Sequence, residues 1–165
     1  MSFLQEFSNE FEQEAQTTRK MLSIVPDDKY DWRPHEKSMS IRQLATHIGE
    51  LPSWIKMTMT TDELNFANNP YNPVQVNNTS DLMTYFENNL REGREYLKEE
   101  YEGQIDKNWT LRSGETVYSV RPKKDVLRMC LSQTIHHRAQ LGVFLRLLNI
   151  PIPGSYGPSA DEGFL

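Results

Sequence analysis

The stretch from Ser132 to Ile150, SQTIHHRAQLGVFLRLLNI, sets polar side chains into an apolar pattern. Its apolar residues recur at steps of three and four, the spacing that places side chains on one face of an α-helix. Pro122 stands upstream, and proline is favoured at the first position of a helix. The pattern therefore predicts one long helix from Pro122 to about Asn149.

Three further segments carry the same helical spacing. They cover residues 2–25, 40–60 and 80–101. The second begins with SIRQ, which fits a capping box in which Ser40 and Gln43 satisfy each other's backbone donors. Pro52 lies inside this segment and predicts a bend near Ile48, because proline removes the backbone hydrogen bond to that carbonyl.

The connections between these helices differ in length. Residues 65–80, NFANNPYNPVQVNNTS, are rich in Asn and Pro and predict a long irregular crossover. Residues 108–120, NWTLRSGETVYSV, alternate around Ser113 and Gly114 and predict a small β-hairpin. The Pro- and Gly-rich tail, residues 150–165, is expected to lie along the bundle.

We therefore expect an all-α fold in which residues 1–165 form a single domain. Its architecture would be a four-helix bundle, with the long crossover between the second and third helices and the hairpin before the fourth. A chain of 165 residues has the length of one ordinary domain and can bury one sizeable core.

Composition and charge exclude several classes of protein. The net charge is −5 and the basic residues are scattered, which argues against nucleic acid as a partner. The sequence contains no apolar run of the roughly 18 residues that a membrane span needs, and its acidic N-terminal segment does not resemble a signal peptide. The single cysteine, Cys130, excludes an intramolecular disulfide and fits the reducing cytoplasm. We expect a cytoplasmic protein that acts on a small molecule.

The apolar spacing of the last helix predicts which of its polar residues face inward. The apolar residues that define its inward stripe are Val126, Cys130, Leu141, Phe144 and Leu148. At the helical period this stripe passes through positions 133 and 137, so Gln133 and His137 are expected to face the interior. The neighbouring His136 is rotated by about 100° and falls on a flank.

Gln133 and His137 suggest a metal site. Side chains four residues apart on a helix converge on one point, which is how a helix supplies two ligands to a metal. His47 lies on the inward stripe of the second helix and would be the third member. Three protein ligands with an open position form a catalytic zinc-type centre. The alternative is a hydrogen-bonded core cluster of the same three residues without metal.

Other candidate residues carry weaker signals. Ala15, Thr18 and Gly93 are small and fall near the same layer, which suggests either a cavity or ordinary packing of large against small residues. Arg138 either clamps a substrate carboxylate or forms an ion pair between the helix and the tail. His136 is expected to hydrogen-bond a neighbouring helix or a metal ligand.

Three segments of the sequence resemble the DinB-like superfamily of metal-binding four-helix bundles, which includes transferases of low-molecular-weight thiols. The matching segments are DWRPHEKSMSIRQLATHIGELPSW, HHRAQLGVFLRLLNIPIPG and YGPSADE, which begin at Asp31, His136 and Tyr156. Together with the bundle layout, the resemblance extends over nearly the whole chain.

The resemblance implies a divalent metal, zinc or nickel, held by one histidine of the second helix and two histidines of the last. In this sequence the corresponding positions are His47, 133 and His137, and position 133 holds glutamine. An amide oxygen is a weaker ligand for zinc or nickel than an imidazole. The site would therefore have reduced affinity, recruit another group such as Asp161 or Glu162, or lack the metal.

The resemblance also implies a function, a metal-dependent enzyme that transfers a low-molecular-weight thiol to a small electrophile. Hydrolysis by a metal-bound hydroxide is compatible with the same residues. The alternative is a non-catalytic bundle that binds a small ligand, its metal site weakened or lost because position 133 is Gln. A homodimer is implied by the resemblance alone.

Overall fold

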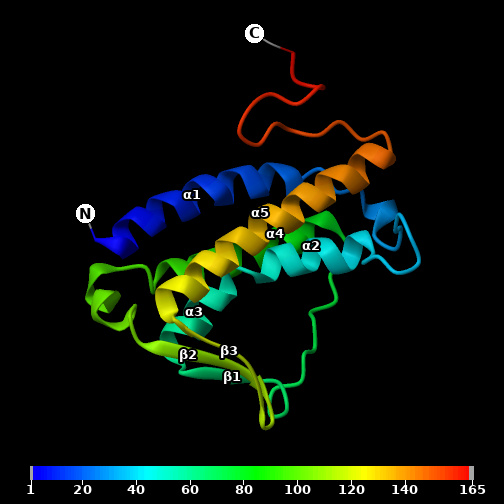
Figure 1. Ribbon diagram of the computed structural model, residues 1–165. Helices are drawn as coiled ribbons and strands as arrows, with labels where there is room; N and C mark the ends of the chain where they lie inside the picture. The colour runs from blue at the N-terminus through cyan, green and yellow to red at the C-terminus, as the bar shows by residue number, and fades with distance from the viewer. Residues whose placement is uncertain (1, 164–165) are drawn as a thin grey trace.

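The computed structural model describes residues 2–163 and is dominated by helices packed side by side (Figure 1). The α-helices are α1 (Phe3–Leu22), α2 (Ile41–Glu50), α3 (Ser53–Thr60), α4 (Thr79–Arg94) and α5 (Lys123–Leu147), and the short 3-10 helices are η1 (Asp27–Lys29) and η2 (Glu99–Gln104). Helix α1 packs against α4 and α5, and α2 packs against the same two helices. No helix among the described residues is long and apolar enough to cross a membrane.

The second predicted helix is broken in two at Pro52. Its start is as expected, because the Ser40 hydroxyl accepts from the Gln43 backbone N–H at 3.2 Å and the Gln43 side chain accepts from the Ser40 N–H at 2.9 Å. Helix α2 ends at Glu50 and α3 begins at Ser53, so the interruption is a break rather than the expected bend. Proline cannot donate the backbone hydrogen bond that would continue the helix.

Glycine 93 lets α4 approach this break closely. A Cβ atom at Gly93 would lie 2.8 Å from the carbonyl oxygen of Pro52, too close for any side chain. Ala15 and Thr18 of α1 are also buried, with 4% and 0% of their surface exposed. Gly93 therefore serves close packing, and the pocket found beside His47 has none of these three small residues in its lining.

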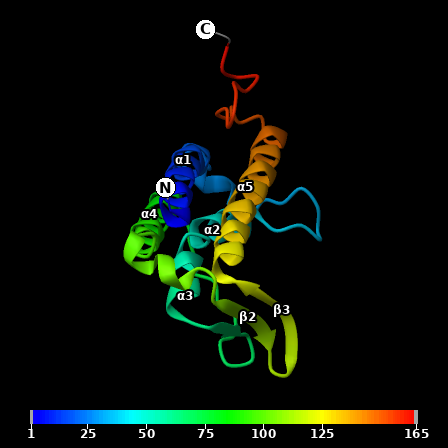
Figure 2. The same ribbon diagram turned by 60° about the vertical axis from the view of Figure 1, so that its left-hand side comes forward.

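A small sheet covers one end of the bundle, below α3 and beside the start of α5 (Figures 1 and 2). Its strands are β1 (Glu63–Asn65), β2 (Asn108–Ser113) and β3 (Thr116–Pro122). The predicted hairpin is confirmed as the antiparallel pair β2–β3, which turns at Gly114 with a positive φ of 55°. Strand β1 was not expected. It pairs in parallel with β2, and its Asn65 side chain accepts from the Gly114 N–H at 3.0 Å.

The tail lies at the opposite end, where it folds over the ends of α1 and α5 (Figure 1). Asp161 forms an ion pair with Arg146 of α5, with oxygen and nitrogen atoms 3.0 Å apart, and Glu162 accepts from the Gly154 N–H at 2.9 Å. The ion pair with Arg146 agrees with the expectation that the tail lies along the bundle, whereas the Glu162 bond is internal to the tail.

Cys130 lies in a small cluster with Trp109 and Val126, where the sheet meets α5. Burial raises the pKa of its thiol to about 12, so the thiolate that reacts with electrophiles is scarce at neutral pH. We predict that Cys130 does not react with a disulfide reagent such as dithionitrobenzoate in the native protein but reacts fully in concentrated guanidinium chloride. Fast labelling of the native protein would show that this junction opens readily.

Candidate functional site

In the middle of α5 the buried positions are 134 and 138, each one residue after the predicted positions 133 and 137. Thr134 and Arg138 occupy buried positions, whereas Gln133 is exposed and His137 is half-buried. The expectation that Gln133 faces the interior is therefore wrong. The apolar stripe was counted through Phe144, which is only half-buried, and a charged residue such as Arg138 is rarely buried without a partner.

Arg138 has its partners in the interior. Only 2% of its surface is exposed, and its Nη1 atom donates to Glu14 Oε2 of α1 at 2.6 Å and to Thr18 Oγ1 at 3.1 Å. The Tyr156 hydroxyl from the tail accepts from Arg138 Nη2 at 3.0 Å and donates to Glu14 Oε1 at 2.8 Å. The arginine is thus not free to clamp a substrate. Its ion pair joins α5 to α1, and the tail contributes a neutral hydroxyl instead of the expected carboxylate.

Two histidines from different helices meet on the half-buried side of α5. The rings of His47 on α2 and His137 on α5 have centroids 4.9 Å apart, with an interplanar angle of 76°. The Nδ1 atom of His47 lies 3.4 Å from Glu50 Oε2, and Nδ1 of His137 lies 2.8 Å from Gln140 Oε1. A partner at Nδ1 orients an imidazole and leaves Nε2 for a ligand or a proton.

Burial favours the neutral form of the His137 ring. Desolvation lowers the pKa of His137 more than the hydrogen bond that His137 donates to Gln140 raises it, and the neighbouring His47 and His136 lower it further. A neutral imidazole has a free lone pair, as a metal ligand or a general base requires. His136 is exposed, and its ring centroid lies 4.9 Å from that of His137.

Tyr71 from the crossover holds the carboxylate that orients His47. Its hydroxyl donates to Glu50 Oε2 at 2.9 Å. Burial, and then the hydrogen bond to Glu50, raise the pKa of Tyr71 above its usual range, so the phenol stays protonated and keeps donating. The spacing of the sequence gave no signal for Tyr71, because it lies in an irregular segment.

The His47–His137 pair has no third strong metal ligand beside it among the described residues. Within residues 2–163, no three His, Cys, Asp or Glu side chains gather as a metal-binding group. Asp161 and Glu162 already have partners, which are Arg146 of α5 and the Gly154 N–H of the tail. The structure thus brings together two oriented imidazoles, while Gln133, one turn before His137 on α5, is exposed.

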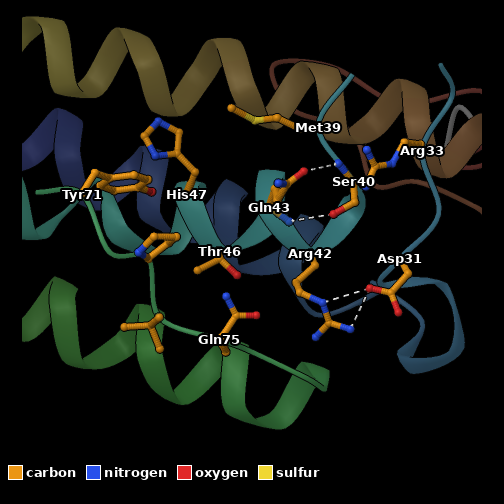
Figure 3. Close-up of a pocket in the computed structure, with 12 residues that line it drawn as sticks. Asp31, Arg33, Met39, Ser40, Arg42, Gln43, Thr46, His47, Tyr71 and Gln75 are labelled. Atoms are coloured by element: carbon orange, nitrogen blue, oxygen red, sulfur yellow. Dashed lines mark hydrogen bonds and ion pairs between the residues drawn. The ribbon is translucent and has the colours of Figure 1, made fainter. Parts of the chain in front are cut away.

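A pocket of about 490 Å³ opens next to His47, between α2, the loop that precedes it and the crossover (Figure 3). Its lining residues are Asp31, Arg33, Met39, Ser40, Arg42, Gln43, Thr46, His47, Tyr71, Pro73, Val74 and Gln75. Helical periodicity could not locate this pocket, because two irregular segments form much of its wall. The site thus combines a histidine pair with a space large enough for a small molecule.

Comparison with known proteins identifies the family of this chain. The sequence matches the DinB family over residues 1–163. The chain belongs to the DinB family. The resemblance identified from the sequence segments is thereby confirmed, whereas no curated protein gave a significant match.

Solved structures of DinB-family proteins share this fold. A DinB-like protein from Bacillus cereus superposes with a TM-score of 0.69 at 18% identity, covering 91% of this chain and 95% of that one. A DinB-like protein from Bacillus subtilis gives 0.67 at 19% identity, covering 91% and 96%. A mycothiol-dependent maleylpyruvate isomerase gives 0.58 at 13% identity, covering 86% of this chain and 63% of that one. At these identities the comparison concerns the fold.

One polar group of the pocket in this DinB-family protein has no protein partner. The Thr46 side chain is 3% exposed, and its hydroxyl has no hydrogen-bond partner among the described residues. A buried hydroxyl without a partner costs about 1–3 kcal/mol. Such unpaired buried groups are uncommon in native folds, and removal of the hydroxyl tests its cost directly.

We predict that Thr46→Val leaves the free energy of unfolding unchanged or raises it by up to about 1 kcal/mol, because valine keeps the shape and removes the unpaired hydroxyl. Thr18→Val makes the same change at a hydroxyl that accepts from Arg138, and it should lower that energy by about 1–3 kcal/mol. Urea denaturation of both variants measures the contrast. Equal losses would mean that the Thr46 hydroxyl is satisfied in solution.

Proposed function

We propose that this DinB-family protein is a metal-dependent enzyme that joins a low-molecular-weight thiol to a small electrophile. The observation that carries the proposal is the His47–His137 pair, whose rings are oriented through Nδ1 and whose His47 lines the 490 Å³ pocket. Thiol chemistry is supported by a structural neighbour of the same fold that is mycothiol-dependent by name.

His47 and His137 would hold the metal, zinc or nickel, through Nε2, and the Gln133 amide oxygen would be a weak third ligand. When bound, a divalent metal lowers the pKa of a thiol that it binds and so increases the fraction of thiolate. Gln133 is exposed, so this side of the site is open to solvent, as entry of a thiol requires.

The other side chains have supporting tasks. Tyr71 and Glu50 hold His47 in one orientation through their hydrogen bond, and Gln140 does the same for His137. His136 is the exposed imidazole beside the pair, and in this proposal it passes the proton released by the thiol to solvent. The electrophile occupies the pocket next to His47, whose wall includes Tyr71.

A second candidate function is a ligand-binding protein without metal. It is favoured by one observation, that the described residues offer no group of three His, Cys, Asp or Glu ligands. In that case His47 and His137 would contribute only neutral hydrogen-bonding groups to the wall of a binding pocket.

Conjugation of N-acetylcysteine with 1-chloro-2,4-dinitrobenzene, followed by absorbance, tests the proposed enzyme. Protein loaded with zinc or nickel should accelerate the reaction, and His47→Ala or His137→Ala should each reduce the acceleration by about 100-fold or more. His35→Ala is the matched control, because His35 is an exposed loop histidine whose removal should leave the rate unchanged.

Two results would contradict the proposal. Acceleration that survives in both His47→Ala and His137→Ala would place the chemistry elsewhere. No acceleration with either metal, in protein that still binds small ligands in the pocket, would favour the second candidate function.

A further inference from the structure

The pocket beside His47 contains one positive charge that the protein does not neutralise. The Arg42 guanidinium is occupied, since it donates to Asp31 Oδ1 at 3.0 and 3.1 Å and to Asn77 Oδ1 at 2.6 Å. Arg33 lines the same pocket, is exposed and forms no ion pair or side-chain hydrogen bond within residues 2–163. The pocket therefore presents one free guanidinium to a ligand.

The backbone at the start of α2 does not compete for an anion. The Ile41 N–H donates to the Trp32 carbonyl at 2.9 Å, and the Arg42 N–H donates to the Tyr30 carbonyl at 2.7 Å. The next N–H, that of Gln43, is taken by Ser40 in the capping box. Recognition of a negative group thus depends on the Arg33 side chain.

Arg33 and His47 stand at opposite ends of the pocket. Figure 3 shows Arg33 beside Ser40, at the start of α2, and His47 beside Tyr71 at the other end. Ser40 and His47 are seven positions apart in the helix, which corresponds to about 10 Å along its axis. A ligand that contacts both ends must therefore be elongated.

The rest of the pocket wall is suited to an apolar body. Met39, Pro73 and Val74 contribute apolar surface to the pocket. Between the ends lies Thr46, whose buried hydroxyl lacks a partner and is turned toward the side where Gln75 lies (Figure 3).

We propose that this pocket binds a small carboxylic acid, with the carboxylate on Arg33 and the apolar body directed toward His47. An arginine fork matches the planar carboxylate with two parallel hydrogen bonds. A dianion such as a phosphate monoester is disfavoured, because Arg33 is the one positive charge of the pocket that the described residues leave without a partner. The inference rests on the proposed function for the reaction at His47, where the electrophilic centre would lie about 10 Å from the carboxylate.

The carboxylate can belong to either of two reactants, the electrophile or the thiol. Binding to metal-free protein is measured by ligand titration with NMR, using two matched pairs of probes. One pair is 4-phenylbutyrate and 4-phenylbutyramide, and the other is N-acetylcysteine and N-acetylcysteinamide. Each pair differs mainly in replacing the carboxylate by a neutral amide.

At least one acid should bind about tenfold more tightly than its amide, and Arg33→Gln should remove that preference. A preference in the phenylbutyrate pair assigns the carboxylate to the electrophile, and one in the cysteine pair assigns it to the thiol. Arg121→Gln is the control, because Arg121 is exposed, lies outside this pocket and has no side-chain partner within residues 2–163.

The inference is overturned if neither acid binds more tightly than its amide, or if Arg33→Gln leaves the preference intact. Unchanged amide resonances away from the pocket verify that the variant is folded. Because no metal and no turnover are involved, this result is independent of the conjugation assay, and either proposal can fail without the other.

Discussion

Replacing Arg138 by methionine is expected to lower the free energy of unfolding by about 3–5 kcal/mol. The substitution leaves the Glu14 carboxylate, which is 7% exposed, without its charged partner in the interior of the bundle. A buried charge that loses its partner keeps the full cost of desolvation. Urea denaturation followed by circular dichroism measures the loss.

Two further variants separate the buried charge from the loss of packing. The double variant Glu14→Leu with Arg138→Met removes both charges and should recover most of the stability, because an apolar pair can replace a buried ion pair. Arg128→Met breaks the exposed ion pair with Glu10 and should cost less than about 1 kcal/mol. Equal losses for Arg138→Met and Arg128→Met would show that the interior pair is solvated.

The second large effect is expected on zinc affinity, from a substitution at position 133. Gln133→His should raise the affinity for zinc by at least about 100-fold, which corresponds to about 2.7 kcal/mol. An imidazole at this position would follow the spacing of two ligands four residues apart and replace a weak amide ligand. Competition with a chromophoric chelator measures the two dissociation constants.

Arg91→His is the matched control for this gain, because it places a new histidine on the exposed surface of α4, away from the pair. It should leave zinc affinity unchanged. If Gln133→His binds zinc no more tightly than the wild type, position 133 does not belong to the same site as His47 and His137.

The sequence was sufficient to predict the elements whose signals are local. The capping residues Ser40 and Gln43 mark the start of α2, and the hairpin turns at Gly114 as its alternating flanks indicate. The three-residue strand β1 was missed, because such a short segment carries no alternating pattern and forms only by pairing with β2.

The candidate site was predicted in part. The sequence singled out His47 and His137, and the structure brings their rings together from α2 and α5. The phase of α5 was misread because Arg138 occupies a buried position, and its partner Glu14 lies more than a hundred residues away in the sequence. No local pattern reveals such a distant partner.

The residues that line the pocket could not be predicted from the sequence for a similar reason. Arg33 and Tyr71 come from irregular segments, where side-chain directions follow no period. Their proximity to His47 depends on how the loop before α2 and the crossover pack against that helix. Only the three-dimensional structure shows that these segments form one wall.

The zinc content of the protein decides whether His47 and His137 form a metal site. Metal-free protein is dialysed to equilibrium against a series of zinc concentrations, and the zinc bound in excess of the dialysate is measured by mass spectrometry for metals. We predict about one zinc ion per chain in the wild type and in His35→Ala, and none in His47→Ala or His137→Ala. A wild type that retains no zinc, or histidine variants that retain as much as the wild type, would contradict the proposed metal site.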